Sequence, residues 1–341
     1  TAIDTTGNTM FTAACDSTVF QYNEGYYNRS PGGDGSMYDA DLRSPNTVWQ
    51  YSYSHDNAHG LFWNCTVQQD SGIVCRYNIS QNDLGNIFCI NYPVNSIYCY
   101  NNVVYIGPGL SSVIISERNN GGSGTRKYYF YNNIIYNNSS NAGYDFRSSG
   151  YGYTRIIDYN VFYGKHPISE PPDAHKITTD PKFVNPGSGG IGIGTVAGYK
   201  LQADSPCINS GIAVHNHCGF DYWGGAVPVD VDVDRGAFEY QGTSGLDLDQ
   251  PSKMTEFSLT QNYPNPFNPL THINFYLPQT LFVTLKVYDI VGREVAIVLE
   301  EQLAQGPHIA EFDGTGLSSG PYFYTLKAGS YTETKQLLLM R

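Results

Sequence analysis

The sequence has few charged residues and no long run of apolar ones. Asp, Glu, Lys and Arg together make up 15% of its 341 residues. A membrane-spanning helix needs about 20 consecutive apolar residues, and because no such run occurs, we expect no membrane span. Long segments with the period of an amphipathic helix are also absent, which disfavours a helical fold. No signal-peptide pattern opens the chain, and because its first residue is Thr, we expect a processed N-terminus.

Basic residues are the scarcer of the charged types. Lys and Arg number 19 against 31 Asp and Glu, a net charge of −12. Nucleic acids are bound largely by neutralising phosphates, so we expect no nucleic-acid partner. Acidic polysaccharides are disfavoured too, unless a cation bridges the two. The seven Cys suit an oxidising exterior, and their odd number leaves one thiol unpaired within the chain, for which Cys15 is the candidate.

Gly and Tyr are abundant, at 36 and 29 residues, and the N-terminal two thirds of the chain contain an irregular repeat. Its units are FQYNE at 20–24, WQYSY at 49–53, CRYNI at 75–79, CYNNV at 99–103, FYNNI at 130–134 and IDYNV at 157–161. Successive Asn or Ser positions are separated by 29, 26, 24, 31 and 27 residues. Irregular periods of this size predict the coils of a right-handed parallel β-helix.

Each column of the repeat has a predicted role. The first residues of the units should point inward and stack, and the residues after the Asn column should continue this core beyond a bend. The column itself comprises Asn23, Ser52, Asn78, Asn102, Asn133 and Asn160. Asn tolerates the left-handed conformation, and its amide can bond to neighbouring coils. We therefore interpret this column as a structural ladder.

Two further sets of residues follow the same spacing. Residues 54–57 and 80–83 should occupy the same corner of successive coils. Cys65 and Cys89 are 24 residues apart, as are Cys75 and Cys99, so each pair is expected to stack. Stacked strands lie roughly 4.8 Å apart, which permits a disulfide, but we favour buried thiols. In the same way, Cys207 and Cys218 are candidates for closing a short loop.

The end of this region contains three landmarks, TDPKFV at 179–184, YKLQADSPCINSG at 199–211 and DRGAFEY at 234–240. With them, the chain resembles secreted β-helix proteins of the pectate-lyase-like class. The resemblance implies the right-handed parallel β-helix fold and leaves the reaction open. We expect this domain, with its capping region, to span residues 1–241, followed by a polar linker over 242–254.

The last part of the chain carries four motifs in order: QNYPNPFNP at 261–269, INFYLP at 273–278, VYDIVGREV at 287–295 and LSSGPYFY at 317–324. Residues 255–341 thereby resemble the type A C-terminal sorting domain of proteins exported by the bacterial type IX secretion system. Alternating apolar residues predict strands, and breaks at 291–293 and 318–320 predict hairpin turns. The expected fold is a small Ig-like β-sandwich. The resemblance implies recognition by the secretion machinery, and a location outside a diderm bacterium or on its outer surface.

Candidate chemistry is concentrated in the first coils. Asp34, Asp39 and Asp41 form the best constellation for calcium, because Ca²⁺ prefers oxygen ligands. Asp39 and Asp41 are also catalytic candidates, together with His55, Asp56 and Arg76 on nearby coils, as acid–base and charge-stabilising groups. The competing interpretation is that these residues cap exposed corners. Calcium is the candidate cofactor, and no other is expected.

Two later segments look like ligand motifs without supporting context. Residues 187–194 are rich in Gly but lack the strand and helix of a dinucleotide site. The alternation of Asp and Val over 230–234 predicts a closing strand whose carboxylates face solvent.

Two functions remain open. We favour a non-catalytic extracellular structural protein that assembles with copies of itself into a filament or surface layer, because a β-helix has open strand edges at its ends and this charge-poor, Tyr-rich chain suits close contacts. The alternative is a secreted polysaccharide lyase or glycosidase acting on an acidic glycan, for which the fold offers only analogy.

Overall fold

A computed structural model describes the chain over residues 10–12, 15–29, 36–41, 44–65, 72–91, 93–118, 124–147, 152–214, 219–227, 232–241, 257–259, 262, 265 and 267–340. The chain divides into two compact units, Thr1–Thr243 and Ser244–Arg341. Within the residues described, no helix is both long and apolar enough to cross a membrane. The expected linker at 242–254 lies outside the described residues.

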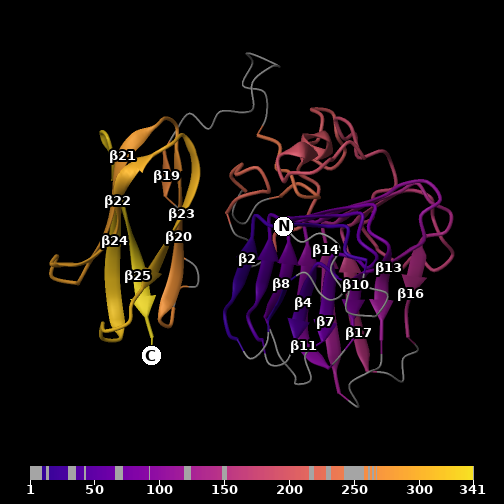
Figure 1. Cartoon of the computed structure of the whole chain (residues 1–341), viewed down its shortest axis with the longest axis horizontal. Coiled ribbons are helices and arrows are strands. Elements are labelled where there is room, and N and C mark those ends of the chain that lie inside the picture. Colours follow the sequence, from indigo (N-terminus) through magenta and orange to yellow (C-terminus); the bar gives the residue numbers. More distant parts are fainter. Residues whose placement is uncertain are drawn as a thin grey trace. The chain divides into compact units, whose positions relative to one another are not determined.

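The first unit is a parallel β-helix built from three six-stranded sheets, each coil giving one strand to each sheet (Figure 1). The first sheet contains β1 (Met10–Thr12), β4 (Tyr38–Asp41), β7 (Phe62–Cys65), β10 (Gly85–Ile90), β13 (Ser112–Glu117) and β16 (Gly143–Asp145). The second contains β2 (Val19–Gln21), β5 (Val48–Gln50), β8 (Ile73–Arg76), β11 (Val94–Tyr100), β14 (Arg126–Tyr131) and β17 (Tyr153–Asp158). The third contains β3 (Glu24–Tyr26), β6 (Tyr53–His55), β9 (Ile79–Gln81), β12 (Val103–Ile106), β15 (Ile134–Asn137) and β18 (Val161–Gly164).

The inward column of the second sheet is the predicted one, residue by residue. In register it comprises Phe20, Trp49, Cys75, Cys99, Phe130 and Ile157. Most of these side chains are buried in one continuous core, and Phe20 and Ile157, in the outermost coils, pack against it. Aromatic and aliphatic side chains repeating at the coil period therefore specify this sheet.

The predicted ladder is also confirmed. The backbone N–H of Asn78 donates to Oδ1 of Asn102, that of Asn102 to Asn133, and that of Asn133 to Asn160, each over 3.0 Å. The left-handed conformation, however, falls one residue before each ladder position, for example at Tyr77 with φ 50°. The side-chain amide is thus free to bond within the stack while its predecessor makes the turn.

The prediction that the next column continues the core is wrong. Tyr53, Ile79, Val103, Ile134 and Val161 do lie in register, but the inward positions of the third sheet are their successors, among them Val104, Ile135 and Phe162. The expected column faces outward and is covered by the end of the unit. Gly236, for instance, packs so closely on Ile134 that a Cβ there would lie 2.6 Å from its Cδ1.

One of the two expected cysteine stacks is present. Cys75 and Cys99 are paired in register, and both are buried free thiols. The expected stack of Cys65 on Cys89 is wrong, because β7 and β10 place Trp63 opposite Cys89. Cys207 is likewise a buried free thiol, while Cys218 lies outside the described residues.

The remainder of the unit wraps back over the third sheet and includes a short 3-10 helix, η2 (Thr195–Tyr199). Arg235 fixes this region, because its guanidinium donates to the carbonyls of Asn160, His175 and Ser210. Asp234 is 1% exposed and accepts N–H groups from Asn209 and Tyr240. The expectation that its carboxylate faces solvent is therefore wrong.

The second unit consists of two antiparallel sheets around their own apolar core, which is consistent with a β-sandwich. One sheet contains β19 (Ser258–Leu259), β20 (Leu270–Leu277) and β23 (Gly306–Asp313), and the other β22 (Glu294–Leu303), β21 (Leu281–Tyr288), β24 (Gly320–Ala328) and β25 (Tyr331–Leu339). A turn at Gly292 joins β21 to β22 as expected. The break at 318–320 is not a hairpin, because it connects strands of different sheets.

Candidate functional site

The outer face of the first sheet presents a row of side chains that combines a carboxylate with an indole. In register it comprises Asp39, Trp63, Cys89 and Ser116, hereafter the outer row. Asp39 is 3% and Trp63 7% exposed, although both point away from the core of the β-helix. Strand alternation places them there, since the inward positions beside them are Tyr38 and Phe62.

Two polar groups of the outer row have no hydrogen-bond partner among the described residues. They are the indole N–H of Trp63 and the hydroxyl of Ser116. Burying a polar group without a partner costs roughly 1–3 kcal/mol, so buried donors are normally satisfied. Donors left unpaired on an outward face suit recognition of a polar ligand.

The catalytic candidates His55 and Asp56 lie on the outer face of the third sheet. Nδ1 of His55 is 2.8 Å from Oδ2 of Asp56, and its Nε2 is 3.2 Å from Oε1 of Glu24. The imidazole is buried and stacks on the rings of Tyr53 and Tyr26. Burial lowers the pKa of His55, but hydrogen bonds to Asp56 and then Glu24 outweigh it and bring the pKa above its ordinary value.

Arg76 lies on the outer face of the second sheet. Its Nε donates to Gln50 and its Nη1 to the hydroxyl of Tyr100, both over 2.8 Å. The side chain is 3% exposed. Among its described contacts the guanidinium therefore bridges neighbouring coils, which is a stabilising role.

The structure thus places the predicted site residues on three different faces. Asp39 and Asp41 are alternate residues of β4, and His55 and Asp56 are in contact, but Arg76 lies apart from both pairs. Asp34 and the side chain of Asp41 lie outside the described residues. No group of three or more His, Cys, Asp or Glu positioned for a metal ion occurs in the described part of the chain. The calcium site stays a prediction.

Asp83, at the corner that the spacing predicts, is an interior residue. Its Oδ2 accepts the hydroxyls of Ser54 and Ser80, and its Oδ1 accepts the backbone N–H of Asn57. Burial raises the pKa of Asp83 to about 6. Asn28, Asn57 and Asp83 accordingly form a second, shorter ladder that aligns the first coils.

Sequence reasoning missed Glu24 and Trp63. Glu24 is the last residue of the first repeat unit, and its register with Tyr53 puts it on the same outward column. That register was the signal available for Glu24. Trp63 lies outside the repeat units, and the first sheet gave no comparable pattern from which to place it.

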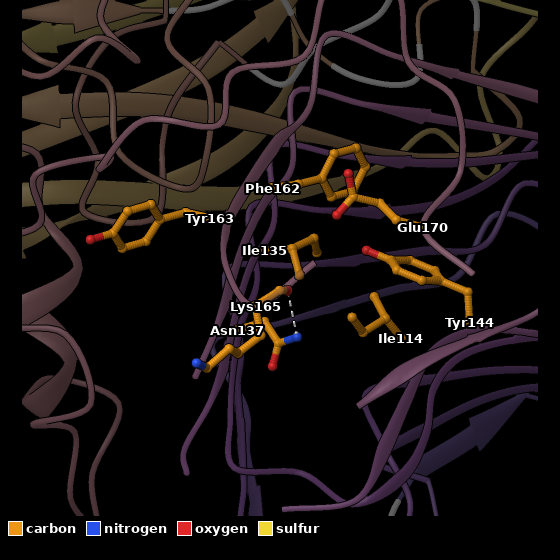
Figure 2. A pocket seen from close by; sticks show the side chains of 8 residues that line it. All are labelled: Ile114, Ile135, Asn137, Tyr144, Phe162, Tyr163, Lys165 and Glu170. Atoms are coloured by element: carbon orange, nitrogen blue, oxygen red, sulfur yellow. Dashed lines mark hydrogen bonds between the residues drawn. The ribbon is translucent and has the colours of Figure 1, made fainter. Parts of the chain in front are cut away.

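A small hollow lies at the C-terminal end of the β-helix (Figure 2). Ile114, Ile135 and Phe162 line it, and all three belong to the main core. On the other side, Nδ2 of Asn137 donates to the carbonyl of Lys165 over 2.9 Å. The hollow is therefore the closed end of the core and not a ligand site.

Comparisons with known proteins add to this geometry. The family model described as a secretion system C-terminal sorting domain matches residues 261–340. A lacto-N-biosidase of Bifidobacterium longum subsp. longum is 41% identical over 97 residues, which is 27% of this chain. The matched part is only 6% of that enzyme.

The fold and the first match together define the class of protein: a parallel β-helix followed by a sorting module. Residues 261–340 are a type IX C-terminal sorting domain, which implies interaction with the secretion machinery. The chain is therefore a type IX-sorted β-helix protein that is exported to the cell surface or the extracellular space.

Proposed function

We propose that this protein acts on carbohydrate, binding an oligosaccharide on the outer face of the first sheet and cleaving a glycosidic bond there. One observation carries the proposal: Asp39 and Trp63 are adjacent in the outer row, and the indole N–H of Trp63 has no partner among the described residues. A sugar offers apolar C–H faces and hydroxyls. An indole can pack on the first and donate to the second.

The chemistry would require two carboxylates. Asp39 and Asp41 are alternate residues of β4, and alternate strand residues lie about 6.6 Å apart on one side of a sheet. Glycosidases place their two carboxyl groups roughly 5–9.5 Å apart. In this arrangement one carboxylic acid would protonate the leaving oxygen, and the other carboxylate would attack the anomeric carbon or activate a water as that C–O bond breaks.

The partial relative supports the same class of ligand. Its name is that of a glycosidase, and the shared segment is long enough to cover several coils of a β-helix. The net charge of −12 favours neutral oligosaccharides over acidic ones.

The test is release of reducing ends from a panel of neutral oligosaccharides by the full chain. We expect Asp39→Asn to lower the rate at least 100-fold, and Trp63→Phe to weaken binding while leaving the fold intact by circular dichroism. Asp204→Asn, an exposed carboxylate in the capping region, is the matched control and should keep full activity. No turnover and no binding across the panel would refute the proposal.

The same assay with a chelator separates the predicted calcium ligands Asp34, Asp39 and Asp41 from a metal-independent pair. Activity that is lost with the chelator and restored by Ca²⁺ would place calcium at this face. Unchanged activity would assign the carboxylates to acid–base chemistry alone.

Self-assembly is the second candidate. Within the described part, β1, β2 and β3 each have a neighbour on one side only, and an unpaired edge is a template for another chain. The outer face of the second sheet adds a stack of Tyr98 on Tyr129, with ring centroids 4.5 Å apart. Negative-stain electron microscopy decides this point: filaments or sheets support assembly, and dispersed particles at high concentration exclude it.

A further inference from the structure

The glycine-rich segment 187–194, hereafter the lid, lies across the outer face of the third sheet. Gln81 of β9 exchanges two hydrogen bonds with Gly189, through Nε2 to the carbonyl at 2.9 Å and from the N–H to Oε1 at 3.0 Å. Gly187 packs against the ring of Tyr105, where a Cβ would lie 2.6 Å away. At the far end, the N–H of Gly192 donates to Oε1 of Glu24.

These contacts are mostly polar. Ile191, at the centre of the lid, is 61% exposed, so apolar burial does little to hold the segment down. Hydrogen bonds to Gln81 and Glu24 therefore carry much of the attachment. A change at either side chain should loosen the lid without unfolding the coils beneath it.

Glu24 is also one of the two carboxylates that hold His55. A neutral imidazole has one N–H and one acceptor nitrogen, whereas an imidazolium donates from both. The contacts of His55 to Asp56 and Glu24, at 2.8 and 3.2 Å, are both favourable only when the ring is protonated. The same Glu24 oxygen thus joins the histidine to the lid.

The titratable groups around the imidazole come from three coils. β3 and the residue after it contribute Glu24, Tyr26 and Tyr27; β6 and its corner contribute Tyr53 and Asp56; and Asp83 follows β9. Three of these groups are carboxyls and three are phenols. Their charges, where present, are negative, so this environment favours the imidazolium.

We propose that the His55 imidazolium is a latch that keeps the lid closed through Glu24 at mildly acidic pH and releases it as the pH rises above neutral. When His55 loses its proton to solvent, an acceptor nitrogen faces Oε1 of Glu24. Glu24 then turns away and its bond to Gly192 breaks. An open lid uncovers the outer faces of Tyr53 and Tyr105, and the hydroxyl of Tyr53 is buried beneath the lid without a partner in the described structure. This switch does not depend on the proposed carbohydrate activity.

Hydrogen exchange of the full chain, read by mass spectrometry from pH 5 to 8.5, tests the latch. Exchange of a peptide covering 186–195 is divided at each pH by that of the unfolded peptide. We expect its protection to fall roughly ten- to hundredfold across this range, as expected for loss of a hydrogen bond to a charged group. A peptide from β11 in the same digest reports global opening and should stay protected.

Two variants make the test specific. In Glu24→Gln, the amide oxygen can still accept from Gly192 while its NH₂ donates to neutral His55, so the lid should stay protected up to pH 8.5. In His55→Gln, protection should be low at every pH. Glu170→Gln removes a comparable exposed pair with His166 and should keep the wild-type profile.

Loss of lid protection that follows β11, or a Glu24→Gln profile identical to the wild type, would overturn the proposal. If His55→Gln fails to fold, Glu24→Gln still decides, because it retains every backbone contact of the lid. A His55 titration followed by NMR should coincide with the lid transition in the wild type.

Discussion

Asp173 closes the row of hydrogen bonds that ends at Asn160. Its Oδ2 accepts both the backbone N–H of Asn160, at 2.8 Å, and the side-chain Nδ2, at 3.0 Å. Asp173 thus takes the place that the next coil's Asn would occupy. The chain reaches this point just beyond β18, and the bridge of Val161 to Ile177 seals the adjacent sheet edge.

We expect Asp173→Ala to loosen the last coil by about 2 kcal/mol, because two donors of Asn160 lose their acceptor. Hydrogen exchange in β17 and β18 should rise at least tenfold while β8 stays protected. Asp173→Asn keeps one acceptor and should restore most of the protection. Equal exchange in the Ala variant and the wild type would show that the end is held by other contacts.

A central ladder residue should cost more. Asn102 accepts two hydrogen bonds from Asn78 and donates to three acceptors in its own and neighbouring coils. Asn102→Ala leaves these groups buried and unpaired, and we expect a loss of about 3 kcal/mol and a Tm lower by roughly 6–12 °C. Asn141→Ala removes one exposed hydrogen bond and should change Tm by about 1 °C at most. Calorimetry on both variants checks the difference.

Stability should fall as the pH rises through 6 to 8. Burial, and then the charge of Asp234, raise the pKa of Glu239 to about 8, and burial raises that of Asp234 to about 6. In the unfolded chain both groups titrate near 4. The folded protein therefore holds these protons more tightly, and the stability they give is complete below about pH 4 and lost as the pH passes their folded values.

The measurement is Tm at pH 5.5 and 8.5, with the higher value expected at pH 5.5. Glu239→Gln cannot ionise, so it should reduce the difference by about 2–4 °C. Glu294→Gln in the sorting module, an exposed carboxylate, is the control and should leave the difference unchanged. A wild-type Tm that rises toward pH 8.5 would contradict the expectation.

Of the thiols that the structure describes, Cys15 alone should react in the native chain. Cys15 is exposed, whereas Cys75, Cys89, Cys99 and Cys207 are buried. Burial raises the pKa of Cys89 to about 12, and that of Cys75 well above its usual range, so the reactive thiolate is scarce. Maleimide labelling mapped by mass spectrometry should modify Cys15 within minutes and the buried thiols only after unfolding. Rapid labelling of Cys99 in the native chain would contradict the register of the second sheet.

The second sheet was predictable because its repeat carries large side chains at one fixed place in each coil. Phe20, Trp49 and Phe130 announce the inward column, and the Asn that follows three residues later fixes the corner. The turn before the Asn was not predictable at the same level. A left-handed Tyr at 51 or 77 changes which of the next residues points inward, and Tyr is not a residue that signals this conformation.

The first sheet was harder because its coil lengths differ from those of the second. From β7 to β10 the register advances by 26 residues, but from β8 to β11 by 24. Cys65 and Cys89 match the second value while lying in the first sheet, so they do not meet. The outer row was missed for the same reason, since Asp39 and Trp63 share no repeat spacing with the Asn ladder.

The Asn ladder also gives the β-helix a direction. Each backbone N–H points forward to the oxygen of the following coil, so an amide relays the row by accepting on one side and donating on the other. The carboxylate of Asp173 can accept but has no proton to pass on. The row therefore behaves as a polymer with one terminated end: further coils could join only ahead of Asn23. Copies that stack end to end would need a different contact at the Asp173 side.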